Sequence, residues 1–315
     1  MKKIRRLISF MLTVATAAVI AAVFSACSDT GGQNSQQTPD TPVYSNEVQV
    51  VVLLGQSNAE GHTWSQYLPR TVGEEKAGEY AEGYDNVFIS YACTIAENTS
   101  NGEFVPVKLG QGHSVNQFGP EIGIAEKIAE LDPEKPVYII KYAYGATSLT
   151  SNWRSPSSKN TGSLYLSAVD YILGQCAKLE DMDLYPEIKA VCWMQGEDDS
   201  SSNSYNAYEE LERNFVADLR YDLSYYKPAD AEIGFIDAGI SDCSAWTQYR
   251  VINAAKAKLA SEDENHIYID TIAEGLKYNG EPAGAPDIYH FDSASEVKLG
   301  HLFARELIAN FLETD

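Results

Sequence analysis

Short runs of apolar, often β-branched residues alternate along this chain with stretches whose apolar residues recur at helical spacing. Runs bounded by polar or small residues are typical of buried strands. They occur at residues 48–54, 86–91, 137–143, 188–194, 232–238 and 266–270. Helical spacing predicts helices at residues 120–131, 164–179, 205–226, 245–259 and 294–312.

This alternation predicts the α/β class: a three-layer, doubly wound, mostly parallel sheet of about five strands. Neither an internal repeat nor a second linker follows residue 47. One domain over residues 47–315 is therefore the economical interpretation.

The first 46 residues have a different character. Four cations within residues 2–6 precede an apolar run at 7–24, which is typical of a secretory signal, assigned here to residues 1–26. An uncleaved anchor is the alternative, because the run approaches the length of a bilayer span. Residues 27–46 are rich in Gly, Gln, Ser, Thr and Pro and predict a flexible tether. The segment ending at Cys27 resembles the bacterial lipoprotein box, which implies lipidation of Cys27.

Such a leader predicts an exported protein, either a bacterial cell-surface lipoprotein or a secreted one, whose membrane contact is the N-terminal lipid alone. The formal net charge of −22 repels phosphate backbones, so we expect no nucleic-acid partner. The other cysteines are Cys93, Cys176, Cys192 and Cys243, whose spacings fit no zinc pattern and leave disulfide pairing open. Without an H-E-x-x-H motif or a Gly-rich phosphate loop after a strand, we expect no metal and no cofactor.

Ser57 follows the strand at residues 48–54 after a glycine and a glutamine. Ligands in open α/β sheets bind just beyond the carboxyl ends of the strands, so Ser57 is the candidate nucleophile. A structural alternative competes with this, because Ser57 and Glu60 also fit the S-x-x-E capping box of a helix start.

Asp287 and His290 supply what a serine nucleophile needs, namely a base and a carboxylate that orients it. A spacing of three residues in a loop lets Asp287 bond one ring nitrogen and leaves the other to face the serine. The alternative is an ordinary loop before a helix, where Ser293 and Glu296 form a second capping box.

The other histidines are weaker candidates. His266 begins a predicted strand and His301 lies inside a predicted helix, so both are expected to be structural. His62 and His113 could line a pocket, but no carboxylate evident from the sequence orients either ring.

Acyl transfer also needs hydrogen-bond donors for the developing oxyanion. The candidates are the backbone N–H of Ser57, the N–H of Gly119 at a helix start, and the side-chain amide of Gln195 after a strand. Gly119 could equally be a plain helix entry, and Gln195 a satisfied polar residue at a strand end.

Five segments together resemble the SGNH (GDSL-like) hydrolases. They are most similar to the branch of sialate O-acetylesterases and family-six acetylxylan esterases, and their order matches that branch over about residues 48–310. The segments are Gly55–Gly61, Phe118–Gly123, Gly145–Leu149, Trp193–Asp199 and Asp287–Asp292, corresponding to the first block, G-P-E-x-G, G-G-T-S, W-x-Q-G-E-S-D and D-x-x-H-F. Two departures, Ala146 and Asp198, leave substrate choice open.

This resemblance implies a flavodoxin-like SGNH fold and a triad of Ser57, His290 and Asp287. Its motifs also supply the expected substrate-binding residues, which are Gln56, Asn58, Thr147, Ser148 and Glu197. For Glu197, a buried brace of the loop after the strand is the alternative.

We therefore expect a serine esterase that removes O-acetyl groups from carbohydrates, either acetylxylan or another acetylated glycan. A sialate O-acetylesterase and a non-catalytic carbohydrate-binding lipoprotein on the same scaffold are the alternatives. A lipase or thioesterase is disfavoured because no long apolar lid is evident. Tyr142, Tyr144 and Trp153 could stack on sugars or belong to the core.

Overall fold

The computed structural model describes residues 46–93, 98–131 and 136–313. The predicted signal, Cys27 and the rest of the predicted tether up to residue 45 lie outside these residues. Within them, no helix is both long and apolar enough to span a bilayer.

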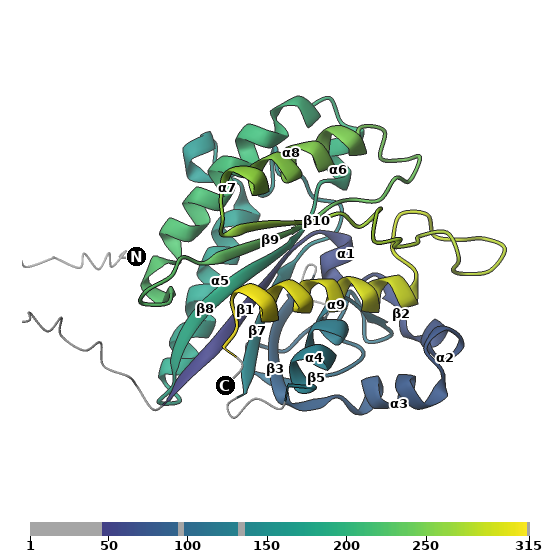
Figure 1. Cartoon of the computed structure of the whole chain (residues 1–315), viewed down its shortest axis with the longest axis horizontal. Coiled ribbons are helices and arrows are strands. Elements are labelled where there is room, and N and C mark those ends of the chain that lie inside the picture. The colour runs from purple at the N-terminus through teal and green to yellow at the C-terminus, as the bar shows by residue number, and fades with distance from the viewer. Residues whose placement is uncertain (1–45, 94–97, 132–135, 314–315) are drawn as a thin grey trace, which may run out of the picture. The chain divides into compact units, whose positions relative to one another are not determined.

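Eight strands form the main sheet, in the order β10-β9-β8-β1-β7-β3-β4, with β5 paired to β3 (Figure 1). Six of them run parallel to one another: β1 (Glu47–Gly55), β3 (Tyr84–Cys93), β7 (Val137–Ala143), β8 (Tyr185–Met194), β9 (Gly234–Ala238) and β10 (His266–Ile269). The predicted α/β class and parallel sheet are confirmed, whereas the predicted number of strands was too low.

All six predicted runs are strands of the main sheet, and two further strands that were not predicted join them. β4 (Asn98–Thr99) and β5 (Val105–Val107) pair antiparallel with β3, and a separate ribbon joins β2 (Thr63–Trp64) to β6 (Gln117–Phe118). These strands have only two or three residues, and β5 contains Pro106. Such short segments show no alternating hydrophobic pattern, so the sequence does not predict them.

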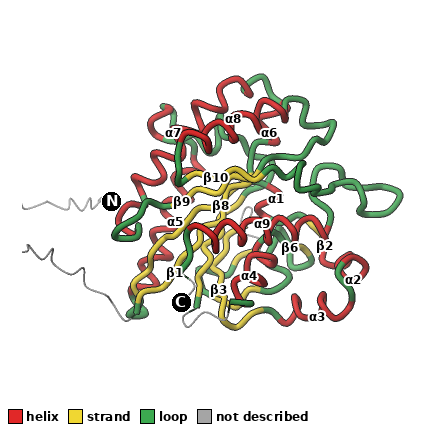
Figure 2. Tube along the Cα trace, in the orientation of Figure 1, coloured by secondary structure: helices red, strands yellow, loops and turns green. Residues whose placement is uncertain are grey.

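Helices lie on both faces of the sheet, and Figure 2 shows the strands between them. α9 (Ser293–Asn310) crosses in front of the strands in Figure 1 and packs on α4 (Glu121–Ala129), while α5 (Ser163–Glu180) runs behind β7 and β8. The others are α1 (Ser57–Glu60), α2 (Leu68–Thr71), α3 (Glu74–Glu82), α6 (Glu197–Ser201), α7 (Tyr208–Asp222) and α8 (Tyr249–Glu262).

The contact between α4 and α9 is made backbone to backbone. A Cβ on Gly123 would lie 2.1 Å from the carbonyl oxygen of Val297, and one on Gly300 would lie 2.2 Å from that of Pro120. Any side chain at either position would force the helices apart, so glycine sets their separation.

The centre of the sheet is apolar on both faces. Residues 50–54 of β1 are fully buried, because a central parallel strand is covered by helices on either side. The four cysteines of the described residues are all buried and free. They therefore act as small core residues rather than cross-links.

Candidate active site

The site forms where three parallel strands end. In register, Gly55 of β1 lies opposite Ala143 of β7 and Met194 of β8. The chain visits β3 and β7 on one side of β1 before it reaches β8 on the other, so this edge is the topological switch point at which open α/β sheets bind ligands. The segments that follow Gly55, Ala143 and Met194 therefore converge.

Ser57 is the first residue of α1 and is largely buried. Gln56 precedes it as the helix cap but its side chain makes no capping hydrogen bond, and the carboxylate of Glu60 is turned elsewhere. The alternative interpretation, a capping box made by Ser57 and Glu60, is therefore wrong.

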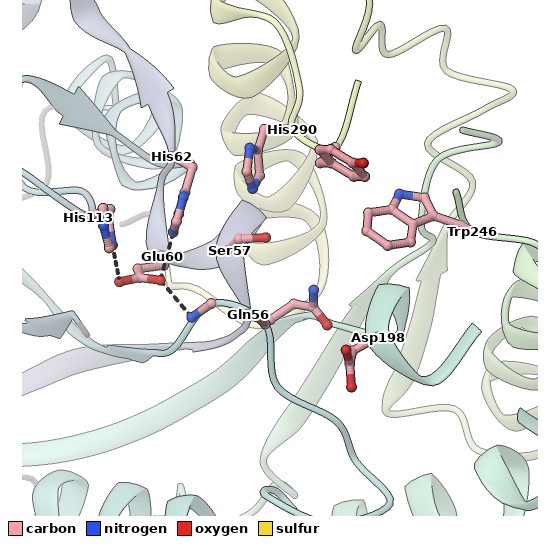
Figure 3. A pocket seen from close by; sticks show the side chains of 11 residues that line it. Gln56, Ser57, Glu60, His62, His113, Asp198, Trp246 and His290 are labelled. Carbon is pink, nitrogen blue, oxygen red and sulfur yellow. Dashed lines mark hydrogen bonds and ion pairs between the residues drawn. The ribbon is translucent and has the colours of Figure 1, made fainter. Parts of the chain in front are cut away.

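Asp287 and His290 lie in the loop between β10 and α9. The carboxylate Oδ2 of Asp287 is 2.7 Å from His290 Nδ1, and its Oδ1 accepts the backbone N–H of Tyr289 at 3.0 Å. The hydrogen bond to His290 holds the pKa of Asp287 below its ordinary value of 3.8. The His290 ring is directed toward Ser57 in Figure 3. The arrangement can orient an imidazole over a serine hydroxyl.

A second contact ties the loop that carries His290 to helix α1. Asn58 accepts the backbone N–H of Phe291 through Oδ1 at 3.1 Å and donates through Nδ2 to Glu197 Oε1 at 2.8 Å. Glu197 is fully buried, and burial raises its pKa. Asn58 thereby fixes the backbone next to His290 against α1.

Ser57 and His290 open into a cavity of about 370 Å³. One wall consists of the rings of Trp246 and Tyr289, whose centroids are 5.6 Å apart. Asp198 lies on the same side (Figure 3). Tyr289 is half exposed, so the wall offers an apolar face to a ligand entering from solvent.

The opposite wall is a stack of imidazoles over a buried carboxylate. The ring centroid of His62 is 4.6 Å from that of His290 and 4.2 Å from that of His113. Glu60 is fully buried beneath them, and its two oxygens lie 2.9 Å from His62 Nε2 and 2.9 Å from His113 Nδ1 (Figure 3). The N–H of Gly145 donates to Glu60 Oε2 at 2.6 Å.

This stack has an electrostatic consequence. Burial raises the pKa of Glu60, but the hydrogen bonds from the two imidazoles outweigh it and lower the pKa. Burial lowers the pKa of His62. Glu60 is thus a carboxylate that orients both imidazoles. It is the partner that the sequence did not reveal for His62 and His113.

Two of the three predicted oxyanion donors are already engaged. The N–H of Gly119 donates to Glu121 Oε1 at 2.9 Å, and Gly119 does not line the cavity. The Gln195 amide is fully buried and donates to Asp199 Oδ2 at 2.7 Å and to the Thr147 carbonyl at 3.0 Å. Of the three predicted donors, the backbone N–H of Ser57 is therefore the one that adjoins the cavity and is not engaged by Glu121, Asp199 or Thr147.

Of the predicted substrate-binding residues, Gln56 lines the cavity. Asn58 and Glu197 instead form the buried brace described above. Thr147 accepts the Trp153 indole N–H at 2.9 Å, and Ser148 bonds the side chain of Ser151. These four residues support the surrounding loops rather than the cavity wall, because their polar groups are taken up by protein partners.

The aromatic residues at the cavity also differ from the expected ones. Trp153 is fully buried in the core, and the partly buried Tyr142 packs on it at a centroid distance of 6.3 Å. Trp246 and Tyr289 line the cavity in their place. Tyr289 could have been found from its position inside the Asp287–His290 motif, whereas no local signal distinguished Trp246.

Three residues at the cavity are placed where they could hold a metal ion. Ligand atoms of Glu60, His62 and His113 all lie within 4.8 Å of one another. The sequence predicted no metal site, because these residues match no metal-binding motif and His113 is far from the other two in the chain.

Residues 47–309 match the family described as carbohydrate esterase, sialic acid-specific acetylesterase. Comparison with curated proteins gave no significant match.

Two solved structures share the fold. A protein from Arabidopsis thaliana is 19% identical with a TM-score of 0.57, covering 84% of this chain and 99% of its own. NanS is 17% identical with a TM-score of 0.59, covering 85% of this chain and 98% of its own. At these identities the likeness establishes the arrangement of strands and helices.

Proposed function

Because the chain belongs to the carbohydrate esterase family of sialic acid-specific acetylesterases, we propose that it is an exported serine esterase that deacetylates glycans through Ser57, His290 and Asp287. The observation that carries the proposal is the 2.7 Å contact between Asp287 Oδ2 and His290 Nδ1, with the His290 ring directed toward Ser57.

In this mechanism Ser57 Oγ attacks the acetyl carbonyl while His290 Nε2 takes the serine proton. Asp287 accepts the Nδ1–H, which fixes the tautomer and stabilises the imidazolium. His290 then protonates the departing sugar hydroxyl and leaves an acetyl group on Ser57. A water molecule, deprotonated by His290, attacks that acetyl group and releases acetate.

The oxyanion requires donors that are not already engaged. We assign the Ser57 N–H and add the N–H of Ala146, which lines the cavity and has no hydrogen-bond partner among the described residues. Ala146 adopts a left-handed φ of 54°, a conformation that alanine rarely takes and that is found where a backbone group is held for function. Removal of one such donor costs about 2.7–4 kcal/mol in other serine enzymes.

The cavity lining favours a neutral acetylated sugar, such as acetylated xylan, over an acetylated sialic acid. The lining residues include two carboxylic acids, Glu60 and Asp198, and neither lysine nor arginine. A sialic acid carries a carboxylate, which such a lining repels. The rings of Trp246 and Tyr289 offer a sugar an apolar face.

The test is acetate release from acetylated xylan oligosaccharides and from O-acetylated sialic acid, with a chelator present throughout. We expect xylan to be the better substrate and Ser57→Ala to reduce the rate by about 10⁴-fold or more. If the Ser57→Ala variant released acetate as fast as the wild type, the mechanism would be refuted. Faster release from sialic acid would refute the neutral-sugar assignment alone. Binding of the glycan without turnover would support a non-catalytic lipoprotein.

Export and lipidation of Cys27 are tested separately. The proposal rests on the cationic and apolar pattern of residues 1–26 and on the lipoprotein-like segment that ends at Cys27. In a bacterial host, Cys27→Ser should move the protein from the membrane fraction to the soluble fraction. Membrane association that persists in this variant would favour an uncleaved anchor.

A further inference from the structure

The imidazole wall contains more ligating groups than the proposed reaction uses. Ser57, His290 and Asp287 complete a triad without Glu60, His62 or His113. Yet these three residues gather two imidazoles and a carboxylate at one point of the cavity (Figure 3). A buried carboxylate flanked by two histidines is a donor set found in metal centres.

We propose that Glu60, His62 and His113 form a binding site for a divalent transition-metal ion of the zinc class, open to the cavity beside Ser57. The ligand atoms would be His62 Nε2, His113 Nδ1 and a carboxylate oxygen of Glu60. Two imidazoles and one carboxylate suit zinc and its neighbours better than calcium or magnesium, which prefer oxygen ligands throughout.

The distances are compatible with an ion after a small adjustment. Zinc lies about 2.0–2.2 Å from nitrogen and oxygen ligands, so tetrahedral ligand atoms are about 3.3 Å apart. Both nitrogens are now 2.9 Å from Glu60 oxygens, and the three ligand groups span no more than 4.8 Å. A metal would replace the protons that now bridge these pairs. In a neutral ring the displaced proton moves to the other ring nitrogen.

The surroundings hold the ligands in place. The Gly145 N–H orients the Glu60 carboxylate from behind at 2.6 Å, the kind of supporting hydrogen bond that metal sites use. Gly145 also leaves the space free, because a Cβ there would lie 2.8 Å from Glu60 Oε2 and 3.0 Å from His62 Nε2.

The open side of the site faces the substrate cavity. All three ligand residues line the cavity together with Ser57, so water or a substrate oxygen could complete the coordination. A bound ion would also bring positive charge to a lining that contains neither lysine nor arginine. The preference for a neutral sugar proposed above is that of the metal-free site, which the chelator maintains. With the ion bound, a substrate that carries a carboxylate close to the scissile ester would be favoured instead.

The experiment is equilibrium dialysis of the purified full chain against Zn²⁺ near pH 7.5, with Co²⁺ absorption as a second probe of coordination. We expect one Zn²⁺ per chain with micromolar affinity. His113→Gln and Glu60→Gln should each weaken binding by more than about tenfold, and Gly145→Ala by about 10–100-fold. His113 is partly exposed, so its variant should fold even if the substitution at buried Glu60 does not.

A matched control lies elsewhere in the chain. His301 Nε2 contacts Glu126 Oε2 at 2.6 Å, a pair of one imidazole and one carboxylate, so His301→Gln should leave Zn²⁺ binding unchanged. The proposal is overturned if the wild type takes up no stoichiometric Zn²⁺. It is equally overturned if uptake survives in His113→Gln but is lost in His290→Ala, which would place the ion on the proposed catalytic base.

Discussion

Lys141 supports the site from inside the sheet, and its replacement by methionine should destabilise the protein strongly. It lies in β7 with no solvent exposure, and its ammonium donates to Glu121 Oε2 at 2.7 Å and to the Gln111 carbonyl at 3.0 Å. The other oxygen of Glu121 accepts the Gly119 N–H. Lys141→Met would leave a buried carboxylate with no cation beside it.

The magnitude follows from the burial of both partners, which are each 0% exposed. Removing one partner of such a pair costs about 3–5 kcal/mol, because the remaining charge stays in the protein interior. Methionine fills nearly the same apolar volume, so packing contributes little. For a domain of this size about 1 kcal/mol corresponds to about 2–4 °C, so the Tm should fall by about 6–20 °C.

Urea unfolding and thermal melting measure this loss. The double variant Lys141→Met/Glu121→Gln removes the stranded charge and keeps an acceptor for Gly119, so it should recover at least half of the lost stability. Lys127→Met is the matched control, because Lys127 and Glu130 form a partly exposed pair and should contribute about 0–1 kcal/mol. A Lys141→Met variant no less stable than Lys127→Met would refute the reasoning.

Two further predictions concern carboxyl groups. Asp287→Asn should lower kcat for acetyl ester hydrolysis by about 10²–10⁴-fold with little change in KM, because His290 loses the partner that fixes its tautomer; a loss below tenfold would contradict the assigned role. Glu296 is fully buried with both carboxylate oxygens unpartnered among the described residues, and burial raises its pKa well above 4.5. The unfolded chain ionises first, so this residue costs stability as pH rises above about 4.5, by up to about 1.4 kcal/mol per pH unit. Glu296→Gln should therefore stabilise the protein more at about pH 8 than at about pH 5 in urea unfolding, and an equal gain at both would contradict this.

The fold was predictable where hydrophobic pattern and tertiary burial agree. The strand predicted at residues 137–143 is β7, and α5 and α9 begin and end within two residues of the predicted bounds. Central parallel strands are largely apolar because helices cover both faces, so their sequences stand out. β4 and β5 span only two and three residues, too few to show a pattern, and could not be recognised.

The site was predictable only as far as its contacts are local in sequence. Asp287 and His290 are three residues apart, and their contact followed from the spacing. The contacts of Glu60 with His62 and His113 could not be predicted in this way. Glu60 fits an S-x-x-E pattern that also describes a helix cap, and His113 comes from a distant loop. The second suggested capping box fails likewise: Ser293 bonds Glu281, and the carboxylate of Glu296 has no partner among the described residues.

The glycine contact between α4 and α9 has a consequence for motion. The loop that carries His290 leads into α9, while α4 follows directly on Gly119, which lies against the backbone of α1 near Ser57. Two helices that touch through their backbones have no flexible side chains between them to absorb sliding. The loop that carries His290 and the helix that carries Ser57 are therefore expected to move together. The loops of Trp246 and Ala146 line the cavity, so we expect the cavity to open through those loops rather than through a hinge between the helices.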